Sequence, residues 1–400
     1  MDVIMICDFC SNFDGKENTR FLYLAKKLKD RGHNVEIITS DFSHSKKAHF
    51  SEQPQNYPFK ITMLHEPSYR KNISLKRFFS HFIWGKNVKK HLMDRKPPDV
   101  VYAAVPTLQA AYEAGKFCKR NHIKYIIDIQ DLWPEAYKMV FNIPIFCDVA
   151  FLPFSCLAGR IYKAADVIFA VSDTYLNRAL KVSKKNTQGH SVYIGTDLIE
   201  FDKNIKQYEC YERTALRDSK PDEILIVYGG SLGDSYDIKL VIDALALIQK
   251  LDYKFVIVGS GQEENNLQQY AREKQVNAHF VGRVEYERMC AILSLCDIAV
   301  NPIKHNSAAS IINKHGDYAA AGLPVINTQE SEEYRFLVNE YQMGFNCNNG
   351  DVNDVANRIS MLIEDSALRE KMGENSRRCA EDRFDRSKTY LTFLQEIENI

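Results

Sequence analysis

Short apolar runs alternate with helical patterns along most of the chain. The runs are about four to six residues long, which is the length of a buried strand. Between them lie amphipathic segments such as residues 18–31, where Phe21, Leu24 and Leu28 recur at helical spacing. We predict strands at residues 3–7, 35–39, 61–64, 100–104, 125–128, 167–171, 192–194, 224–228, 255–258, 279–281, 298–301 and 325–327. We predict further helices near 238–250, 263–275, 285–295 and 310–321.

A polar stretch interrupts this alternation. Residues 202–222 are rich in Lys, Glu, Asp and Tyr and lack periodicity, so we interpret them as a linker. Alternating strands and helices predict parallel sheets that are covered on both faces. The fold class is therefore α/β, with two doubly wound, Rossmann-like domains at 1–202 and 203–378, which place ligands in the cleft between them. The amphipathic segment 367–398 suggests a last helix, 379–400, that crosses back onto the first domain.

Composition narrows the class of protein. The 400 residues suit two domains, and the 52 basic residues balance the 52 acidic ones, so no global field points to nucleic acid. The N-terminal residues lack the basic region of a signal peptide, and we expect a cytoplasmic protein. Cys7 and Cys10 form a single CxxC pair, for which buried thiols are a simpler interpretation than a redox or metal role.

One charged pair opens a predicted helix in the stretch NKHGDYAAAGLPVI, residues 313–326. Lys314 and Asp317 lie three positions apart and therefore share one helix face. Gly322 should end this helix, and Pro324 could not continue it. The pair could present a lysine to phosphate and a carboxylate to ribose hydroxyls, or it could be an exposed salt bridge.

Two glycine-rich loops follow predicted strands in the same half. Loops of this kind let backbone N–H groups approach an anion, although each could also be a plain tight turn. Neither loop is a Walker A sequence. With Lys314 and Asp317 they would line one rim of the sheet and bind a nucleotide diphosphate. The candidate loop residues are Gly229, Gly230, Ser231, Gly233, Gly259 and Gly261.

These stretches resemble the nucleotide-binding domain of glycosyltransferase family 4, whose members are retaining enzymes of the GT-B fold. The matching segments are 228–245, 255–267, 279–289, 296–303 and 313–326. The segment 15–39 is similar to the opening glycine loop, helix and strand of the family. The segment DIQDLWPEA, 128–136, resembles a subgroup that builds bacterial capsule or O-antigen polysaccharides on lipid carriers.

The resemblance implies transfer of a sugar from a nucleoside diphosphate donor, UDP in our prediction, with the departing diphosphate taking the acceptor proton. It assigns Asp317 to the ribose, whereas Ala309 stands where a first carboxylate is usual and leaves room for an N-acetylated or deoxy hexose. Ser231 and Tyr236 replace the usual Arg and Lys, so Lys314 becomes the main candidate for the diphosphate. Further donor candidates are Arg283, Lys304, His305 and Ser310.

The same resemblance assigns the first domain to a saccharide acceptor and implies a reaction that needs no strong protein base. Gly15, Lys16 and Asn18 form the acceptor loop, with Lys16 in place of a second glycine. Asp131 would orient a sugar, or it would cap a helix. No Asp-x-Asp triplet occurs, so we expect no required metal and no cofactor besides the nucleotide-sugar.

A segment of the first half mixes basic and aromatic residues without any acid. Residues 69–91 contain Phe78, Phe79, Phe82 and Trp84, and residues 141–154 are apolar but too broken to span a bilayer. This pattern favours peripheral contact with the inner face of the plasma membrane, where a polyprenyl-linked acceptor would reside. The alternative is an amphipathic core helix with a buried loop.

Two other functions remain open at this point. A sugar-nucleotide epimerase of the same fold would need clustered acids and histidines, whereas His190, His279 and His315 are scattered and we interpret them as structural. A non-catalytic nucleotide-binding partner of another transferase would explain the missing carboxylate at Ala309.

Overall fold

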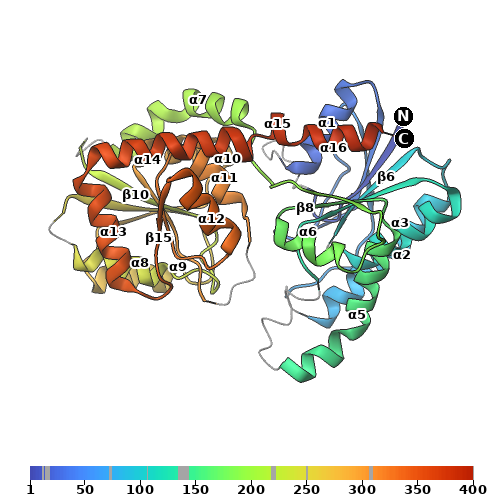
Figure 1. The fold of residues 1–400 in the computed structure, drawn as a ribbon, viewed down its shortest axis with the longest axis horizontal. Helices are drawn as coiled ribbons and strands as arrows, with labels where there is room; N and C mark the ends of the chain where they lie inside the picture. The colour runs from blue at the N-terminus through green and yellow to red at the C-terminus, as the bar shows by residue number, and fades with distance from the viewer. Residues whose placement is uncertain are drawn as a thin grey trace. The chain divides into compact units, whose positions relative to one another are not determined.

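The computed structural model describes residues 1–10, 13, 19–71, 74–105, 107–133, 144–217, 222–248, 251–305 and 310–399, without side chains at 144–150 (Figure 1). The chain divides into two compact units, Met1–Tyr193 with Tyr390–Ile400, and Ile194–Thr389. Each unit holds a parallel sheet, which confirms the predicted α/β class with two doubly wound domains. Among the described residues, no helix combines the length and apolar character needed to cross a membrane.

The first unit is built on a seven-stranded sheet in the order β5-β2-β1-β6-β7-β8-β9. Its strands are β1 (Asp2–Ile6), β2 (Asn34–Ser40), β5 (Lys60–Leu64), β6 (Val100–Val105), β7 (Lys124–Ile129), β8 (Val167–Ala170) and β9 (Gln188–Ser191). Its helices are α1 (Arg20–Asp30), α2 (Leu75–Met93), α3 (Leu108–Asn121), α5 (Pro144–Ala164), α6 (Asp173–Leu180) and α16 (Leu391–Glu398). A small hairpin, β3 (Phe42–Ser43) with β4 (Ala48–His49), follows β2.

Successive side chains of β1 point to opposite faces of the sheet, and helices α1 and α16 cover one of these faces. Val3 and Met5 face a core that includes Leu24 of α1 and Phe393 of α16. All four side chains are completely buried, and each contributes about 1.5–3 kcal/mol by leaving water. Because α16 supplies part of this core, the last residues of the chain belong to the first unit.

The second unit has a six-stranded sheet in the order β12-β11-β10-β13-β14-β15. Its strands are β10 (Ile224–Gly229), β11 (Tyr253–Val258), β12 (Ala278–Gly282), β13 (Ile298–Asn301), β14 (Val325–Asn327) and β15 (Gly344–Asn346). Its helices are α7 (Leu198–Arg217), α8 (Ile238–Leu247), α9 (Glu264–Glu273), α10 (Tyr286–Leu295), α11 (Asn313–Ala320), α12 (Glu332–Tyr341), α13 (Val352–Glu364), α14 (Ser366–Cys379), the π-helical turn η1 (Ala380–Phe384) and α15 (Arg386–Thr389).

The order of strands in the second sheet fixes where a ligand can bind. β10 lies between β11 and β13. From β10 the chain adds β11 and β12 on one side of the sheet, and it then adds β13, β14 and β15 on the other side. In open parallel sheets, such a switch point opens a crevice at the carboxyl ends of the strands. The two glycine loops follow β10 and β11, and α11 leads from β13 to β14, so the predicted site residues meet at this edge.

Several predicted elements were wrong. The predicted linker 202–222 is largely the helix α7, whose polar residues cover its exposed face while Leu198, Phe201 and Leu216 are buried. The predicted boundary at 202/203 therefore falls inside a helix, whereas the two units meet in sequence at Tyr193 and Ile194. The last strand of the first sheet was predicted at 192–194 but is the polar stretch Gln188–Ser191, an edge strand with few buried side chains.

The predicted C-terminal helix is also interrupted. The segment 367–398 contains α14, η1, α15 and α16, and the backbone is extended at Asp385. Asp385 forms a β-bridge with Thr196, which places this break at the end of the second unit. The sequence pattern of buried residues continues through the break, which explains why one helix was predicted.

Candidate functional site at the carboxyl edges of the sheets

Helix α11 carries Lys314 in its first turn, next to the end of β10. The Tyr318 hydroxyl on the same helix accepts a hydrogen bond from the Gly229 N–H at 2.8 Å, which ties α11 to the first glycine loop. Ala321 caps the helix and Gly322 follows with φ +67, as predicted from the Gly-Leu-Pro sequence. The residues of α11 after Lys314 are all buried, and this packing fixes the position of the first turn, which carries the lysine.

The Lys314 ammonium group is enclosed by two tyrosine rings. Its Nζ atom lies 4.1 Å from the ring centroid of Tyr228 and 4.1 Å from that of Tyr236. Nζ is buried and has no hydrogen-bond partner within the described ranges. A Cβ atom on Gly230 would lie 2.9 Å from Nζ, so the glycine at this position makes room for the lysine. The rings attract the cation, but they cannot accept its three N–H bonds.

Burial lowers the pKa of Lys314 from 10.5 to about 7. None of the ion pairs in the described part of the chain joins a carboxylate to this lysine. An unpaired buried ammonium is costly, and an anion at this position would remove that cost. The local structure therefore favours a negatively charged ligand beside Gly230.

Asp317 is held on the same helix, away from Lys314. Its Oδ1 atom accepts hydrogen bonds from the Thr196 hydroxyl at 3.0 Å and from the Tyr286 hydroxyl at 2.9 Å. The residue is buried, and burial raises the pKa of its carboxyl group. The alternative of an exposed Lys314–Asp317 salt bridge is wrong, because both groups are buried and Lys314 has no partner there.

The first glycine loop has few backbone donors left for a ligand. The Gly230 N–H donates to Val258 O at 2.9 Å, and the Leu232 N–H donates to Ser260 O at 3.0 Å. Since Gly229 donates to Tyr318, only the amides of Ser231 and Gly233 lack such a bond among the described loop residues. The predicted cradle of N–H groups is thus smaller than the sequence suggested.

The second glycine loop supports the first one. Gly259 has φ +145, and a Cβ atom there would lie 1.8 Å from the carbonyl oxygen of Gly230. A Cβ atom on Gly261 would lie 2.2 Å from the carbonyl oxygen of Leu232. These two glycines therefore allow the loops to pack against each other, which is a structural reason for their presence.

The other predicted donor residues lie around this edge with different exposures. Arg283, Lys304 and His305 are exposed, and His305 pairs with Glu330 at 2.6 Å. Ser310 is buried, and its hydroxyl donates to Glu333 at 3.2 Å. Ala309 lies outside the described residues.

Two of the histidines interpreted as structural have contacts that fit that role. His315 stacks on Tyr334 with centroids 3.4 Å apart, and burial lowers its pKa well below the usual range. His190 contacts Glu396 at 3.0 Å. His279 is exposed in β12, and its contacts neither support nor exclude the structural interpretation.

The first unit also gathers polar groups at the carboxyl edge of its sheet. Asp131 follows β7, its Oδ2 atom accepts a bond from Trp133 Nε1 at 3.3 Å, and burial raises its pKa. The helix that Asp131 might cap would begin beyond Trp133, outside the described residues. Gly15, Lys16 and Asn18 of the predicted acceptor loop also lie outside them. Cys7 and Cys10 are buried free thiols, and burial raises the pKa of Cys7.

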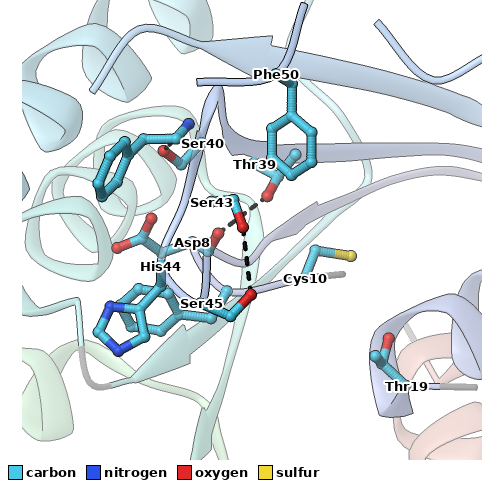
Figure 2. Close-up of a pocket in the computed structure, with 11 residues that line it drawn as sticks. Asp8, Cys10, Thr19, Thr39, Ser40, Ser43, His44, Ser45 and Phe50 are labelled. Carbon is cyan, nitrogen blue, oxygen red and sulfur yellow. Dashed lines mark hydrogen bonds between the residues drawn. The ribbon is translucent and has the colours of Figure 1, made fainter. Parts of the chain in front are cut away.

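A cavity of about 220 Å³ opens beside β1 and β2 (Figure 2). Hydroxyl groups and aromatic rings line it together, a combination that suits the polar edges and apolar faces of a sugar. Figure 2 shows the Ser43 hydroxyl directed toward that of Ser45, with the Phe50 ring above them in this view. The lining residues are Asp8, Phe9, Cys10, Thr19, Thr39, Ser40, Phe42, Ser43, His44, Ser45 and Phe50.

The sequence analysis missed a histidine at this edge. His81 of α2 stacks on Trp133 with centroids 5.4 Å apart, so α2 places an imidazole beside the residues that follow β7. Arg77, one turn earlier, lies 4.8 Å from the Trp133 ring centroid. The mixture of basic and aromatic residues in 69–91 could have indicated that α2 contributes to this site, but we interpreted it as a membrane surface.

Two groups of side chains in the described ranges have the composition of metal ligands. Asp8, Glu66 and His81 form a buried group, and Asp41, His49 and His65 form a more exposed one. In the buried group, the carboxylates already accept hydrogen bonds from hydroxyl groups. Thr107 donates to Asp8 at 2.9 Å, and Ser40 and Ser80 each donate to Glu66 at 2.6 Å. Both groups lie in the first unit, whereas Lys314 and Asp317 lie in the second.

Comparison with known proteins identifies the second unit. Residues 214–379 match the sequence profile described as "Glycosyl transferases group 1". This range includes both glycine loops, Lys314 and Asp317. The match to this glycosyltransferase family thus covers most of the second unit, where the sequence predicted the nucleotide-binding domain. As predicted, the chain is an enzyme of the hexosyltransferase type with the GT-B fold.

Known proteins align with this transferase over most of its length. It is 21% identical over 378 residues to an N-acetyl-alpha-D-glucosaminyl L-malate synthase of Bacillus anthracis, covering 91% of this chain and 89% of the relative. It is 25% identical over 255 residues to the capsular polysaccharide biosynthesis glycosyltransferase CapM of Staphylococcus aureus, covering 60% and 64%. Its fold matches that of Anabaena HepE, crystallised in complex with UDP, with TM-score 0.71, 15% identity and full coverage of both chains.

Proposed function

We propose that this transferase moves a sugar from a UDP-linked donor to a lipid-linked saccharide with retention of anomeric configuration, during synthesis of a bacterial surface polysaccharide. The observation that carries the proposal is the Lys314 ammonium, which is buried without a partner at the switch point of the second sheet. A diphosphate is the anion that best fits a fixed cation beside a glycine turn. The complex of HepE with UDP supports the choice of nucleotide.

Lys314 and Asp317 would act on different parts of the donor. The Lys314 ammonium would stabilise the charge that develops on the leaving diphosphate, which lowers the barrier to bond cleavage. Asp317 would accept hydrogen bonds from ribose hydroxyls through Oδ2, because Oδ1 is already bonded to Thr196 and Tyr286. Since the lysine supplies the positive charge, we propose that donor binding requires no metal ion.

The acceptor would bind to the first unit. The cavity in Figure 2 offers hydroxyl groups and rings at the carboxyl edge of that sheet. Asp131 would orient an acceptor sugar, with Trp133 and His81 beside it. The relationship to CapM, a capsular polysaccharide biosynthesis enzyme, supports a saccharide acceptor.

Helix α2 would dock on the membrane. Leu75, Phe79 and Phe82 are 87%, 60% and 44% exposed, and their spacing places them on one face of the helix. Phe78 packs on Phe154 of α5 at 4.9 Å, which joins the two helices behind this face. The predicted membrane role of Trp84 is wrong, because this side chain is completely buried.

Calorimetric titration with UDP, in EDTA and then in magnesium, tests the donor site. Wild-type protein should bind UDP equally in both, and Lys314→Met should bind it much more weakly. Lys371→Met, which removes an exposed lysine of α14, is the matched control and should behave as wild type. Absence of UDP binding by wild-type protein, or equal binding by Lys314→Met, would reject the proposed site.

Vesicle sedimentation tests the membrane surface. Phe79→Ser should reduce binding to vesicles that contain phosphatidylglycerol, because an exposed apolar side chain no longer inserts. Phe336→Ser in α12 removes a phenylalanine of equal exposure, 61%, and is the matched control. Equal loss or equal retention of binding in the two variants would exclude α2 as the docking face.

A further inference from the structure

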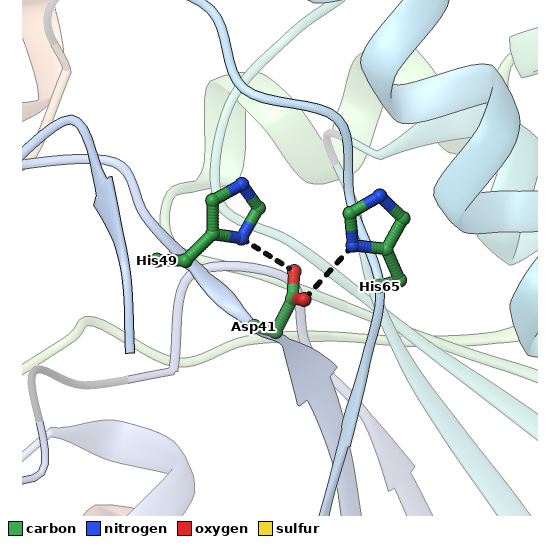
Figure 3. A group of neighbouring side chains, drawn as sticks. All are labelled: Asp41, His49 and His65. Atoms are coloured by element: carbon green, nitrogen blue, oxygen red, sulfur yellow. Dashed lines mark hydrogen bonds and ion pairs between the residues drawn. The ribbon is translucent and has the colours of Figure 1, made fainter. Parts of the chain in front are cut away.

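Asp41, His49 and His65 form a compact group (Figure 3). Both sequence neighbours of Asp41, Ser40 and Phe42, line the cavity of Figure 2, which we call the acceptor-side cavity. His49 Nδ1 lies 3.2 Å from Asp41 Oδ1, and His65 Nδ1 lies 3.0 Å from Asp41 Oδ2. The two imidazole rings are nearly parallel, with centroids 5.5 Å apart and an angle of 15° between them. Figure 3 shows both Nδ1 atoms directed toward the one carboxylate.

Three separate segments bring these side chains together. Asp41 directly follows β2, His49 belongs to β4 of the small hairpin, and His65 directly follows β5. The Glu66 N–H donates to Asp41 Oδ1 at 2.8 Å, which fixes the orientation of the carboxylate. Because β2 and β5 are neighbours in the sheet, Asp41 and His65 emerge side by side, and the hairpin folds His49 back toward them.

The spacing of the three ligand atoms is close to that of a tetrahedral zinc site. Zinc binds imidazole nitrogen and carboxylate oxygen at about 2.0–2.2 Å, so ligand atoms in a tetrahedron lie about 3.3–3.5 Å apart. His49 Nδ1 lies 3.2 Å from one oxygen of the Asp41 carboxylate, and His65 Nδ1 lies 3.0 Å from the other. One ligand atom from each residue lies within 4.8 Å of the other two. Small side-chain rotations would therefore open a space for the ion.

We propose that Asp41, His49 and His65 bind a zinc ion. Each neutral imidazole would move its proton from Nδ1 to Nε2, so that both Nδ1 lone pairs point at the metal with the Asp41 carboxylate as third ligand. Water would fill the remaining position, because the side chains are 38%, 63% and 27% exposed for His49, His65 and Asp41. Two nitrogens and one oxygen favour zinc over magnesium, which prefers oxygen ligands.

The buried group of Asp8, Glu66 and His81 is a weaker candidate for the metal. Its carboxylates already accept bonds from Thr107, Ser40 and Ser80, so a metal would have to displace these hydroxyls. At Asp41, the competing interpretation is a pair of His–Asp hydrogen bonds that only fasten the hairpin. Zinc affinity separates the two interpretations, since hydrogen bonds alone provide no metal binding.

Zinc at this site would act on the acceptor-side cavity. Asp41 is followed by Phe42, Ser43, His44 and Ser45, which are among the residues that line that cavity. A metal that joins the hairpin to the ends of β2 and β5 would hold this wall in one position. The site is separate from the metal-free donor chemistry proposed above, and it does not depend on it.

Isothermal titration with zinc chloride, on the full chain stripped with EDTA, tests the proposal. Wild-type protein should bind one zinc ion that His65→Asn and His49→Asn each weaken by at least about tenfold. His305→Asn is the matched control for His65→Asn, because the two side chains are 68% and 63% exposed and His305 contacts a single carboxylate, Glu330, at 2.6 Å. Magnesium chloride should give no binding at this site.

Hydrogen exchange gives a second readout that a fastening role alone would not produce. Zinc should slow amide exchange in residues 42–50 of wild-type protein and leave His65→Asn unchanged. If wild-type protein binds no zinc, or if His305→Asn loses as much affinity as His65→Asn, the proposal is overturned. The wild-type titration decides the matter even if a histidine variant fails to fold.

Discussion

A buried charged nitrogen occurs in each unit of this transferase, at Arg20 and at Lys314, and the two have opposite surroundings. Arg20 in the first unit is 2% exposed and bonds Asp128 through Nη1 at 2.8 and 3.0 Å. It also donates to the Tyr390 hydroxyl at 3.0 Å, to Tyr193 O at 2.8 Å and to Val192 O. Lys314 in the second unit is half-buried as a residue, but its Nζ atom is buried, and within the described ranges only two aromatic rings surround that atom.

The difference separates a structural charge from a functional one. Arg20 joins α1, β7 and the segment after β9, and its hydrogen bonds and carboxylate offset the cost of burial. Within the described ranges, no carboxylate or hydrogen-bond acceptor offsets the desolvation of the Lys314 ammonium group. This free-energy cost remains until an anion binds. A buried cation without a partner, at the ligand-binding edge of a doubly wound sheet, is therefore a better indicator of function than burial or charge alone.

The largest expected effect is on stability, from breaking the satisfied pair. Asp128→Ala should destabilise the first unit by about 3–5 kcal/mol, because Arg20 would stay buried without its carboxylate. Both tryptophans of the chain, Trp84 and Trp133, lie in the first unit, so tryptophan fluorescence during urea unfolding reports on it selectively. Lys314→Met should leave this transition unchanged, and a similar loss in both variants would contradict the comparison.

The next effect concerns ligand binding, from removing the unsatisfied charge. Lys314→Met should weaken UDP binding by about 2–3 kcal/mol, or roughly 30- to 150-fold, because a charged hydrogen bond to the diphosphate is lost. Calorimetry measures the affinity, and circular dichroism confirms that the fold is kept. Asp128→Ala protein that remains folded should bind UDP within a factor of about two of wild type.

A pH dependence should follow from the unpaired amine. The pKa of Lys314 is about 7 in the free protein, and a bound diphosphate would raise it by stabilising the charged form. The complex then binds more protons than the free protein, so affinity falls as pH rises above 7, by up to about tenfold per unit. UDP dissociation constants at pH 7.5 and 8.5 measure this, and a constant affinity would contradict it.

The smallest effect should come from the groups around Asp317. Tyr286→Phe removes one of the two hydrogen bonds that Oδ1 accepts, at a cost of about 1 kcal/mol. UDP affinity should fall by up to about fivefold, through a less fixed carboxylate at the ribose. Comparison of UDP with 2′-deoxy-UDP checks the reason, because a ribose contact of Asp317 predicts that the two ligands differ less in the variant.

The sequence predicted the inner strands and the helix that carries the charged pair. The strands at 298–301 and 325–327 match β13 and β14, because each is a short buried apolar run that ends in an asparagine. Gly322 and Pro324 marked the end of α11, since local backbone chemistry determines where this helix stops. Lys314 and Asp317 were assigned to the carboxyl edge for the same reason, because α11 connects two parallel strands.

Features that depend on distant contacts could not be predicted. Tyr228 and Tyr236 lie eight positions apart on a strand and a loop, and only folding brings both rings to Lys314. Thr196 and Tyr286 are 121 and 31 residues from Asp317 in sequence. The polar helix α7 and the polar edge strand β9 were missed because their side chains are only partly buried, which leaves little hydrophobic periodicity.

The number of protons taken up when UDP binds tests the central claim most directly. Titrations at pH 8 in two buffers with different ionisation enthalpies give this number from the difference in heat. With the Lys314 pKa at about 7 in the free protein, the account predicts uptake of about 0.9 proton by wild-type protein and none by Lys314→Met. UDP binding by wild-type protein without proton uptake would contradict the claim that an unpaired, largely neutral lysine receives the diphosphate.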